Sequence, residues 1–553
     1  MSYRGGVPQI PARRQPTGPA DVGRRAALSL VAGLALALAF PTHNLYWLAP
    51  VGVALLSAAV LGASWRLAGP LGLTAGLAFF VPTLSWSGVY VGALPWIALC
   101  VLQSLYIAAM TALTAAVQRP LLATRLRPLA YAAVPVFWVL QETARSHTPF
   151  GGFPWARLAF SQADSPLAHL AAYAGAPGVT AAVALLGVLL HAGVSLLLRR
   201  AGRGARTPGL GRSAPALAGA LVALAALPAL AAPLLTPPTG GRPVDVMFVQ
   251  GNVPRPGLEF NAERRQVLDN HVQETLRGAV AAGPAPTLVV WPENASDIDP
   301  LRNPDADAAI RSAVDFVGAP ILLGAVLREP SPMISNVSLF YRPGGGEPER
   351  YVKQHPVPFA EYIPFRSFFR AFSDKVDLVT ADFTAGDRPG AFRVPTPAGA
   401  PYWAIPTICF EVAYDDLMRE ATLQPGKRDN ILVVQTNNAT FGYTAESEQQ
   451  FAISRLRAIE HGRSVVHVST VGVSAFIRPD GSYEDKTSLF TAAAAHGRPV
   501  VREAVTVSDR IGDAPEYVAG GIAVLLAGLA LRARWGAARV QTHPRQKEEV
   551  LVV

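Results

Sequence analysis

The chain has 553 residues, half of them apolar, and its mean hydropathy is positive. Apolar residues are concentrated in residues 1–240, whereas residues 242–510 have the mixed charge of a globular domain. The net charge of +9 comes largely from short Arg clusters between apolar runs, which argues against nucleic-acid binding and is typical of membrane orientation. The two cysteines, Cys100 and Cys409, exclude a disulfide framework and a cysteine zinc site.

Long apolar runs dominate the first half of the chain. Residues 1–23 precede them and, being rich in Pro, Gly and Arg, are expected to be a disordered segment rather than a cleaved signal peptide. A spanning helix needs roughly 20 apolar residues. We therefore predict a membrane domain of seven helices at 24–240 and an eighth helix at 515–533, although buried helices of a soluble protein are the alternative. The runs lie at 24–40, 44–63, 68–88, 92–116, 128–144, 177–198, 214–236 and 517–531.

The placement of arginine predicts the orientation of these helices. If all eight runs span the membrane, every Arg-rich segment falls on one side, and the loops after the first and third helices carry no Lys or Arg. The positive-inside rule then places both termini, including the tail 534–553, in the cytoplasm and residues 242–510 outside. The Arg-rich positions are Arg24, Arg25, Arg66, Arg119, Arg125, Arg127, Arg199, Arg200, Arg203, Arg206, Arg212, Arg532, Arg534 and Arg539.

The segment 145–176 is expected on the same outer side. It contains PFGGFPWARLAFSQ at 149–162, where aromatic residues alternate with Gly and Pro. This composition favours a re-entrant or interfacial loop at the level of the lipid headgroups. A surface loop with Trp155 as an interface anchor explains it equally well.

The external domain alternates between strand-like and helix-like segments, which indicates a layered α/β fold. The motif PDG at 479–481 predicts a hairpin turn. The predicted strands are 244–250, 287–291, 321–326, 336–341, 402–408, 431–435 and 464–469, and the predicted helices are 261–282, 305–317, 411–423 and 446–461.

Three chemically versatile residues follow predicted strands. Glu293 lies in WPEN, Lys353 in YVKQHPVPFAEYIPF and Cys409 in ICFE. The helix expected after Cys409 would lower the pKa of the thiol and offer backbone donors to an oxyanion. Taken singly, Glu293 is also compatible with a surface acid, Lys353 with a solvated charge and Cys409 with an inert buried thiol. The histidines lack a metal-binding spacing, so no metal site is predicted.

In this order, the three motifs resemble the Glu–Lys–Cys triad of the nitrilase superfamily, which implies an αββα sandwich over 242–510. The order of seven helices, this domain and one further helix resembles that of the apolipoprotein N-acyltransferase family. The segments TNNATFG and SEQQ resemble sequences of its actinobacterial branch. Further matches are FVQGNVP at 248–254, GFPWARLAFSQ at 152–162, TNNATFG at 436–442 and SRLRAIEHGR at 454–463.

The resemblance implies a role for each matching residue. Glu293 would be the general base, Lys353 would hold Glu293 and stabilise the oxyanion, and Cys409 would be the nucleophile. Phe410 would contribute a second oxyanion donor through its backbone N–H. Glu361 would orient Lys353 or assist proton transfer, with a purely structural salt bridge as the alternative.

Other matches concern support and substrate binding. Glu411 would support the site, with a helix-start charge as the alternative. Substrate-binding roles are implied for Trp155, Phe260, Asn438 and Phe441. The sequence departs from the family pattern at Phe260, which replaces a Trp, at Phe410, which replaces a frequent Tyr, and in NNATF at 437–441.

The implied activity is acyl transfer without a metal or other cofactor. Cys409 would take an acyl chain from a membrane phospholipid as a thioester and pass it to the α-amine of a lipoprotein's diacylglyceryl-cysteine. A separate polyprenol-phosphate mannosyltransferase is a possible partner. The alternatives are a membrane-tethered nitrilase-type amidase or acyl hydrolase, and a non-catalytic membrane scaffold.

Overall fold

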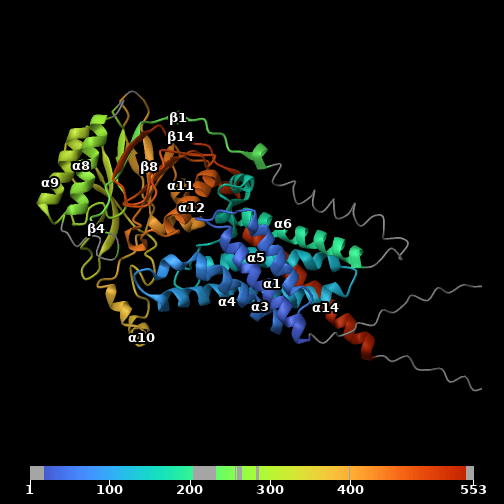
Figure 1. Ribbon diagram of the computed structural model, residues 1–553. Coiled ribbons are helices and arrows are strands. Elements are labelled where there is room, and N and C mark those ends of the chain that lie inside the picture. The colour runs from blue at the N-terminus through green and yellow to red at the C-terminus, as the bar shows by residue number, and fades with distance from the viewer. Residues whose placement is uncertain are drawn as a thin grey trace, which may run out of the picture.

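The computed structural model describes residues 18–202, 232–255, 257, 265–281, 285–397 and 399–542. A bundle of long helices lies beside a domain built from two sheets (Figure 1). Most of the predicted helix at 214–236, together with Phe260, lies outside the described residues. The domain boundaries expected from the sequence stay predictions.

Each predicted apolar run within the described residues coincides with a helix. By length and composition, three of the described helices suffice to cross a membrane, at Ala93–Leu122, Pro166–Leu198 and Ala514–Gly536. These helices agree with a membrane protein, whereas the count of eight spans is not confirmed. The bundle helices are α1 Pro19–Leu38, α2 Leu48–Val60, α3 Trp65–Thr83, α4 Ala93–Leu122, α5 Arg127–His147, α6 Ala171–Gly202 and α14 Ala514–Thr542.

Helix α2 is shorter than its apolar run at 44–63 predicts. It has 13 residues and ends at Val60, because the next residue, Leu61, has a non-helical ψ of 122°. At 1.5 Å per residue such a helix is about 20 Å long, less than the roughly 30 Å of a bilayer core. The apolar residues on either side of α2 therefore belong to turns and not to the helix.

Small residues let the bundle helices approach closely. A Cβ added to Gly33 of α1 would lie 2.2 Å from the carbonyl oxygen of Ala75 in α3. A Cβ added to Gly72 of α3 would lie 2.1 Å from the Thr111 hydroxyl in α4. Close backbone approach at small residues is a common way to pack membrane helices.

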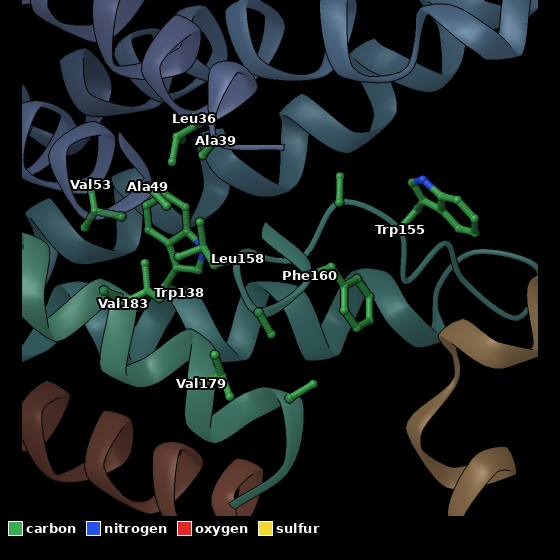
Figure 2. Packing of buried hydrophobic residues seen from close by; sticks show 14 of the residues in the cluster. Leu36, Ala39, Ala49, Val53, Trp138, Trp155, Leu158, Phe160, Val179 and Val183 are labelled. Carbon is green, nitrogen blue, oxygen red and sulfur yellow. The ribbon is translucent and has the colours of Figure 1, made fainter. Parts of the chain in front are cut away.

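One part of the bundle core lies where α1, α2, α5 and α6 meet. Trp138 of α5 is 1% exposed and packs near Leu36, Val53 and Val183 (Figure 2). In the same view, the loop after α5 carries Leu158 into this core and Trp155 away from it, and Trp155 stacks on Phe410 of the sheet domain. The loop therefore contacts both the bundle and the sheet domain.

The second part contains two six-stranded mixed sheets. One has the order β12-β11-β10-β9-β8-β7 and the other β13-β2-β3-β4-β5-β6. Strands β8, β9 and β10 are parallel in the first sheet, and β2, β3 and β4 are parallel in the second. Their bounds are β2 Val246–Gln250, β3 Leu288–Val290, β4 Ile321–Leu327, β5 Ser335–Tyr341, β6 Glu349–Val352, β7 Phe392–Val394, β8 Tyr402–Ile408, β9 Asn430–Thr436, β10 Val465–Ser469, β11 Ala475–Ile477, β12 Tyr483–Glu484 and β13 Ala493–Gly497.

Apolar side chains fill the space between the sheets and beneath the helices. Phe248 and Val433, from different sheets, belong to one buried cluster. Helices α8 (Gln266–Ala281) and α9 (Pro304–Val317) cover one outer face, and α11 (Asp415–Thr422) and α12 (Glu446–His461) lie between the other sheet and the bundle (Figure 1). The layers have the order αββα, as the resemblance implied.

Two local predictions have different outcomes. The PDG turn is confirmed, because β11 and β12 pair antiparallel on either side of it. The single helix predicted at 411–423 is wrong: a 3₁₀ helix, η6 (Cys409–Ala413), and α11 are separated by Tyr414, whose backbone is extended at φ −86° and ψ 124°. This break places Tyr414 between the turn that carries Cys409 and the covering helix.

Candidate active site

The three predicted catalytic residues come together, each from the end of a strand. Glu293 follows β3 and Lys353 follows β6 in one sheet, whereas Cys409 follows β8 in the other. Cys409 has a φ of +56°, a left-handed conformation that is rare for a residue with a side chain. Such strain is often found where a fold presents a reactive group at a tight turn.

Glu293 is 5% exposed and receives several hydrogen bonds. Its Oε1 accepts from Asn336 Nδ2 at 2.7 Å, and its Oε2 accepts from the backbone N–H of Asn437 at 2.9 Å. The Cys409 thiol interacts with the same carboxylate and lowers its pKa. The carboxylate is therefore held in a single orientation with the thiol beside it.

Lys353 is 1% exposed and lies between two carboxylates. Its Nζ is 3.6 Å from Glu293 Oε1 and 2.9 Å from Glu361 Oε1. Glu361 also accepts from Asn336 at 2.9 Å and from the backbone N–H of Val357 at 2.7 Å. Asn336 thus bridges Glu293 and Glu361, and Glu361 pairs with Lys353; a role of Glu361 in orienting Lys353 stays a prediction.

Burial and neighbouring charges shift the pKa values of these groups. Burial opposes the charge of Lys353, but Glu361 and Glu293 more than offset it and raise the pKa of the ammonium group. Burial raises the pKa of Glu293, and Lys353 opposes that rise. Burial and then the charge of Glu293 raise the pKa of the Cys409 thiol. The expectation that a following helix lowers the thiol pKa is therefore wrong, since desolvation dominates.

Glu411 joins the Cys409 turn to the loop that carries Lys353. Its fully buried carboxylate accepts from the backbone N–H groups of Ile408 at 2.6 Å and Gln354 at 2.7 Å. It also accepts from the Tyr351 hydroxyl at 2.8 Å. One carboxylate thus contacts the backbone beside both Cys409 and Lys353, and the supporting role of Glu411 stays a prediction.

Phe410 connects the nucleophile turn to the bundle. Its ring stacks on Trp155 with centroids 5.1 Å apart and on Phe153 with centroids 5.4 Å apart. Trp155 is 1% exposed, so it is buried between the two parts of the molecule instead of anchoring a surface loop. Its substrate-binding role stays a prediction.

A buried ion network also crosses between the bundle and the sheet domain. Arg157, from the loop after α5, lies 2.7 Å from Asp415 of α11. Arg457 of α12 contacts the same carboxylate at 2.6 Å. The pKa of Asp415 is lowered, because the two guanidinium groups outweigh the effect of its burial. The loop of the bundle is therefore bound to the helices behind Cys409 by charge as well as by aromatic packing.

Several residues near the site were not identified from the sequence. Thr436 Oγ1 lies 3.6 Å from Cys409 Sγ, and Gln450 Nε2 lies 3.7 Å from it. Asn336 lies in β5. Its only signal in the sequence is that it is an amide side chain in a largely apolar strand. Gln450 belongs to the SEQQ segment. That segment served only as a match to the actinobacterial branch, and no role in the site was predicted for it.

The remaining predicted residues have different surroundings. Asn438 is 2% exposed, and its polar atoms contact Glu446, Gln450 and Ser469. Phe441 packs edge-on against Trp86 of the bundle, with centroids 5.1 Å apart. Substrate-binding roles for Asn438, Phe441 and Phe260 stay predictions.

The chain is similar in sequence to known proteins of one family. The chain is 39% identical over 517 residues to an apolipoprotein N-acyltransferase of Mycolicibacterium smegmatis, covering 89% of this chain and 83% of that protein. The chain belongs to the apolipoprotein N-acyltransferase family. A relative of the same name from Ralstonia nicotianae is 32% identical, with 93% of this chain and 94% of that protein covered.

The bundle of this family member also matches on its own. A sequence profile described as the apolipoprotein N-acyltransferase N-terminal domain matches residues 32–189. Among solved structures, a nitrilase-superfamily amidase from Nesterenkonia matches with 13% identity and a TM-score of 0.37, covering 51% of this chain and 99% of that chain. The family and the enzyme class predicted from the sequence, an acyltransferase, are confirmed by the sequence relatives.

Proposed function

We propose that this family member transfers an acyl chain from a membrane phospholipid to the α-amine of a diacylglyceryl-cysteine, through a thioester on Cys409. The observation that carries the proposal is the meeting of Cys409, Glu293 and Lys353 at strand ends of two sheets, beside an apolar helical bundle. The triad supplies a nucleophile, a base and a cation, and the apolar bundle places them next to a membrane.

In the first half-reaction, the Cys409 sulfur attacks the carbonyl carbon of the phospholipid sn-1 ester while Glu293 takes the thiol proton. The negative charge that develops on the carbonyl oxygen is stabilised by Lys353 and by the backbone N–H of Phe410. The intermediate collapses, the ester C–O bond breaks, and Glu293 returns the proton to the departing lysophospholipid oxygen. The acyl chain remains on sulfur as a thioester.

In the second half-reaction, the amine of the diacylglyceryl-cysteine attacks the thioester carbonyl. Glu293 accepts a proton from the attacking nitrogen, the C–S bond breaks, and the sulfur regains its proton. The raised pKa of Glu293 suits both steps, because a base with a pKa nearer neutral accepts and returns protons more readily.

The proposed orientation places the triad on the outer side of the plasma membrane, with both termini in the cytoplasm. The start of α1 and the end of α14 lie at the end of the bundle away from the sheet domain (Figure 1). Short α10 (Arg366–Arg370) projects from the sheet domain, and Phe365, Phe368 and Phe372 around it are 73%, 59% and 68% exposed. These aromatics suit the headgroup level of a membrane. Partnership with a mannosyltransferase stays a prediction.

The decisive experiment is mass spectrometry of the purified full-length chain after incubation with phosphatidylethanolamine vesicles and no acceptor. We expect an acyl adduct on Cys409 that is missing from Cys409→Ala and retained in Cys100→Ala. An intact protein without any adduct on Cys409, across vesicles of different acyl chains and headgroups, would refute the proposal.

The acceptor step separates the proposal from its alternatives. Adding a diacylglyceryl-cysteine peptide should yield N-acylated peptide and remove the adduct. A membrane-tethered hydrolase would instead release free fatty acid whether or not the peptide is present. A non-catalytic scaffold would show neither product.

A further inference from the structure

The Cys409 sulfur has polar neighbours that the proposed mechanism does not use. Gln450 of α12 directs its side-chain N–H₂ toward the sulfur at 3.7 Å. Thr436, at the end of β9, lies 3.6 Å from it. Both side chains are fully buried. A donor held against a sulfur that must become a thiolate has chemical consequences, because hydrogen bonds to charged groups are roughly twice as strong as neutral ones.

The surrounding hydrogen bonds determine which end of the Gln450 amide faces the sulfur. Gln450 Oε1 accepts from the Thr436 hydroxyl at 2.7 Å and from Asn438 Nδ2 at 3.0 Å. Because two donors point at the amide oxygen, the amide nitrogen is left to face Cys409. The Thr436 hydroxyl has one proton, and the short contact with Gln450 uses it.

Asn438 is itself oriented by two further contacts. Its Nδ2 donates to Glu446 Oε2 at 2.5 Å, and its Oδ1 accepts from the Ser469 hydroxyl at 2.5 Å. Glu446 is 2% exposed and begins α12 one turn before Gln450. Hydrogen bonds therefore connect Cys409 to Glu446 through Gln450 and Asn438, and the Asn438 N–H₂ donates to both Gln450 and Glu446.

We propose that Gln450 is a further catalytic residue of the acyl-transfer reaction: its N–H₂ holds the Cys409 sulfur in place and stabilises the thiolate as the proton leaves. Asn438 and Glu446 are the positioning residues that keep the Gln450 amide in the productive orientation. The inference rests on the proposed function for the reaction it serves, whereas its contact with the sulfur stands on the geometry alone.

Glu446, the last residue in this series of hydrogen bonds, serves it best in the neutral, protonated form. Burial raises its pKa to about 8, and the nearby charge of Glu293 adds to the rise. An ionised Glu446 also disfavours the Cys409 thiolate through its charge. The protonated acid still offers an oxygen to Asn438, so orientation is kept without adding a negative charge beside Cys409 and Glu293.

The test compares two reactions of the full-length protein. Both use the Cys409 sulfur as the nucleophile, but only one of them involves lipid. One is alkylation of Cys409 by iodoacetamide without lipid, followed on the Cys409 peptide by mass spectrometry. The other is single-turnover thioester formation from phosphatidylethanolamine vesicles over a range of lipid concentrations. The variants are Gln450→Leu and the isosteric Gln450→Glu, assayed at a pH at which the introduced carboxyl is ionised, so that it keeps both accepted hydrogen bonds and has no proton to donate. Glu448→Gln, on the partly exposed face of α12, is the matched control.

We expect both Gln450 variants to slow alkylation and thioester formation by the same factor, on the order of tenfold, with the half-saturating lipid concentration unchanged. Wild-type alkylation rates in Gln450→Glu and Gln450→Leu would overturn the proposal. So would slower thioester formation with a raised half-saturating lipid concentration and normal alkylation, because Gln450 would then serve lipid binding. If the wild type forms no thioester, the proposed function fails and the alkylation rates alone decide the role of Gln450.

The positioning residues have a test of their own. Glu446→Gln retains an acceptor for Asn438 and should keep the alkylation rate at pH 7, whereas Glu446→Ala should slow alkylation several-fold. Above about pH 8, the wild type should lose thioester formation as Glu446 ionises, and Glu446→Gln should not. Equal rates in Glu446→Ala and the wild type, or the same alkaline loss in Glu446→Gln, would remove Glu446 from the proposed chain.

Discussion

The indole N–H of Trp155 donates a hydrogen bond to Gln449 Oε1 at 2.8 Å, joining the loop after α5 to helix α12. Trp86 donates to the same oxygen at 3.1 Å, and the Gln449 N–H₂ donates to the carbonyl oxygens of Thr83 at 3.0 Å and Pro41 at 3.3 Å. The side chain thus uses its full hydrogen-bonding capacity between bundle and sheet domain. Because Gln450 is the next residue, the same helical turn links the bundle to Cys409.

Replacing Gln449 should loosen this junction. In Gln449→Leu, the buried N–H groups of Trp86 and Trp155 lose their acceptor, and each unsatisfied group costs about 1–3 kcal/mol. We expect a lower thermal midpoint and a changed tryptophan emission spectrum, with thioester formation reduced at least several-fold. Glu448→Gln, one residue earlier on α12, should behave as the wild type. An unchanged thermal midpoint in Gln449→Leu would show that this contact does not hold the two parts together.

Removal of the proposed base should affect chemistry more than stability. Glu293→Gln keeps a side chain of the same shape but cannot take the Cys409 proton. General-base catalysis contributes about 10²–10⁴-fold, so thioester formation in a single turnover should fall by at least about 100-fold. Glu347→Gln, on an exposed loop, serves as the control. A loss below tenfold would mean that another group removes the proton.

Glu361 should set the range of pH over which Lys353 stays charged. Its carboxylate and that of Glu293 raise the pKa of Lys353 against the effect of burial. Stability from this raised pKa is present below the pKa of the unfolded lysine and is lost as pH rises through the folded value.

In Glu361→Gln the pKa of Lys353 should therefore fall, and Lys353 should lose its proton at lower pH. We expect thioester formation to be roughly tenfold slower at pH 7; with Glu446→Gln present in both proteins, which removes the loss due to Glu446, the remaining alkaline loss should lie at lower pH in Glu361→Gln. The profile can be measured between pH 6 and pH 10 in single turnovers. A variant profile of the same shape, merely lowered, would contradict the proposed control of Lys353.

Glu446 should make the folded protein less stable as pH rises. Its pKa is about 8 when folded, whereas an exposed glutamate has a pKa of about 4.3. Between these values the folded state binds the proton and the unfolded state does not, so stability falls with rising pH. The thermal midpoint of Glu446→Gln should therefore exceed that of the wild type by an amount that grows from pH 5 to pH 8. A difference that does not vary with pH would indicate that Glu446 is ionised throughout.

Much of the sheet domain was predictable because its signals are local. The apolar runs that predicted β4, β8 and β9 coincide with those strands to within one residue at each end. Glu293, Lys353 and Cys409 were recognisable because each follows a strand within a short motif. The division of 411–423 at Tyr414 was not predictable, since an extended residue between two short helices has no periodic signature.

The surroundings of the site depend on contacts between distant parts of the chain. Asn336 pairs with Glu293 across 43 residues, and Trp155 pairs with Gln449 across 294. Neither contact has a local pattern in the sequence. The raised pKa of Cys409 likewise follows from burial by other segments, which is why a helix start alone suggested the opposite direction.

The amino-acid sequence by itself determined the apolar helices, the alternating strands and helices, the three motifs that carry Glu293, Lys353 and Cys409, and the family. Those features depend on periodicity and on motifs of a few adjacent residues, both of which are properties of the local chain. Only the tertiary structure decided that Trp155 is buried against Phe410, that Gln449 binds the bundle and that Gln450 faces the sulfur. Hydrogen-bond direction and desolvation depend on which distant groups are packed together. Around Cys409, those groups are brought together by the packing of the bundle against α12.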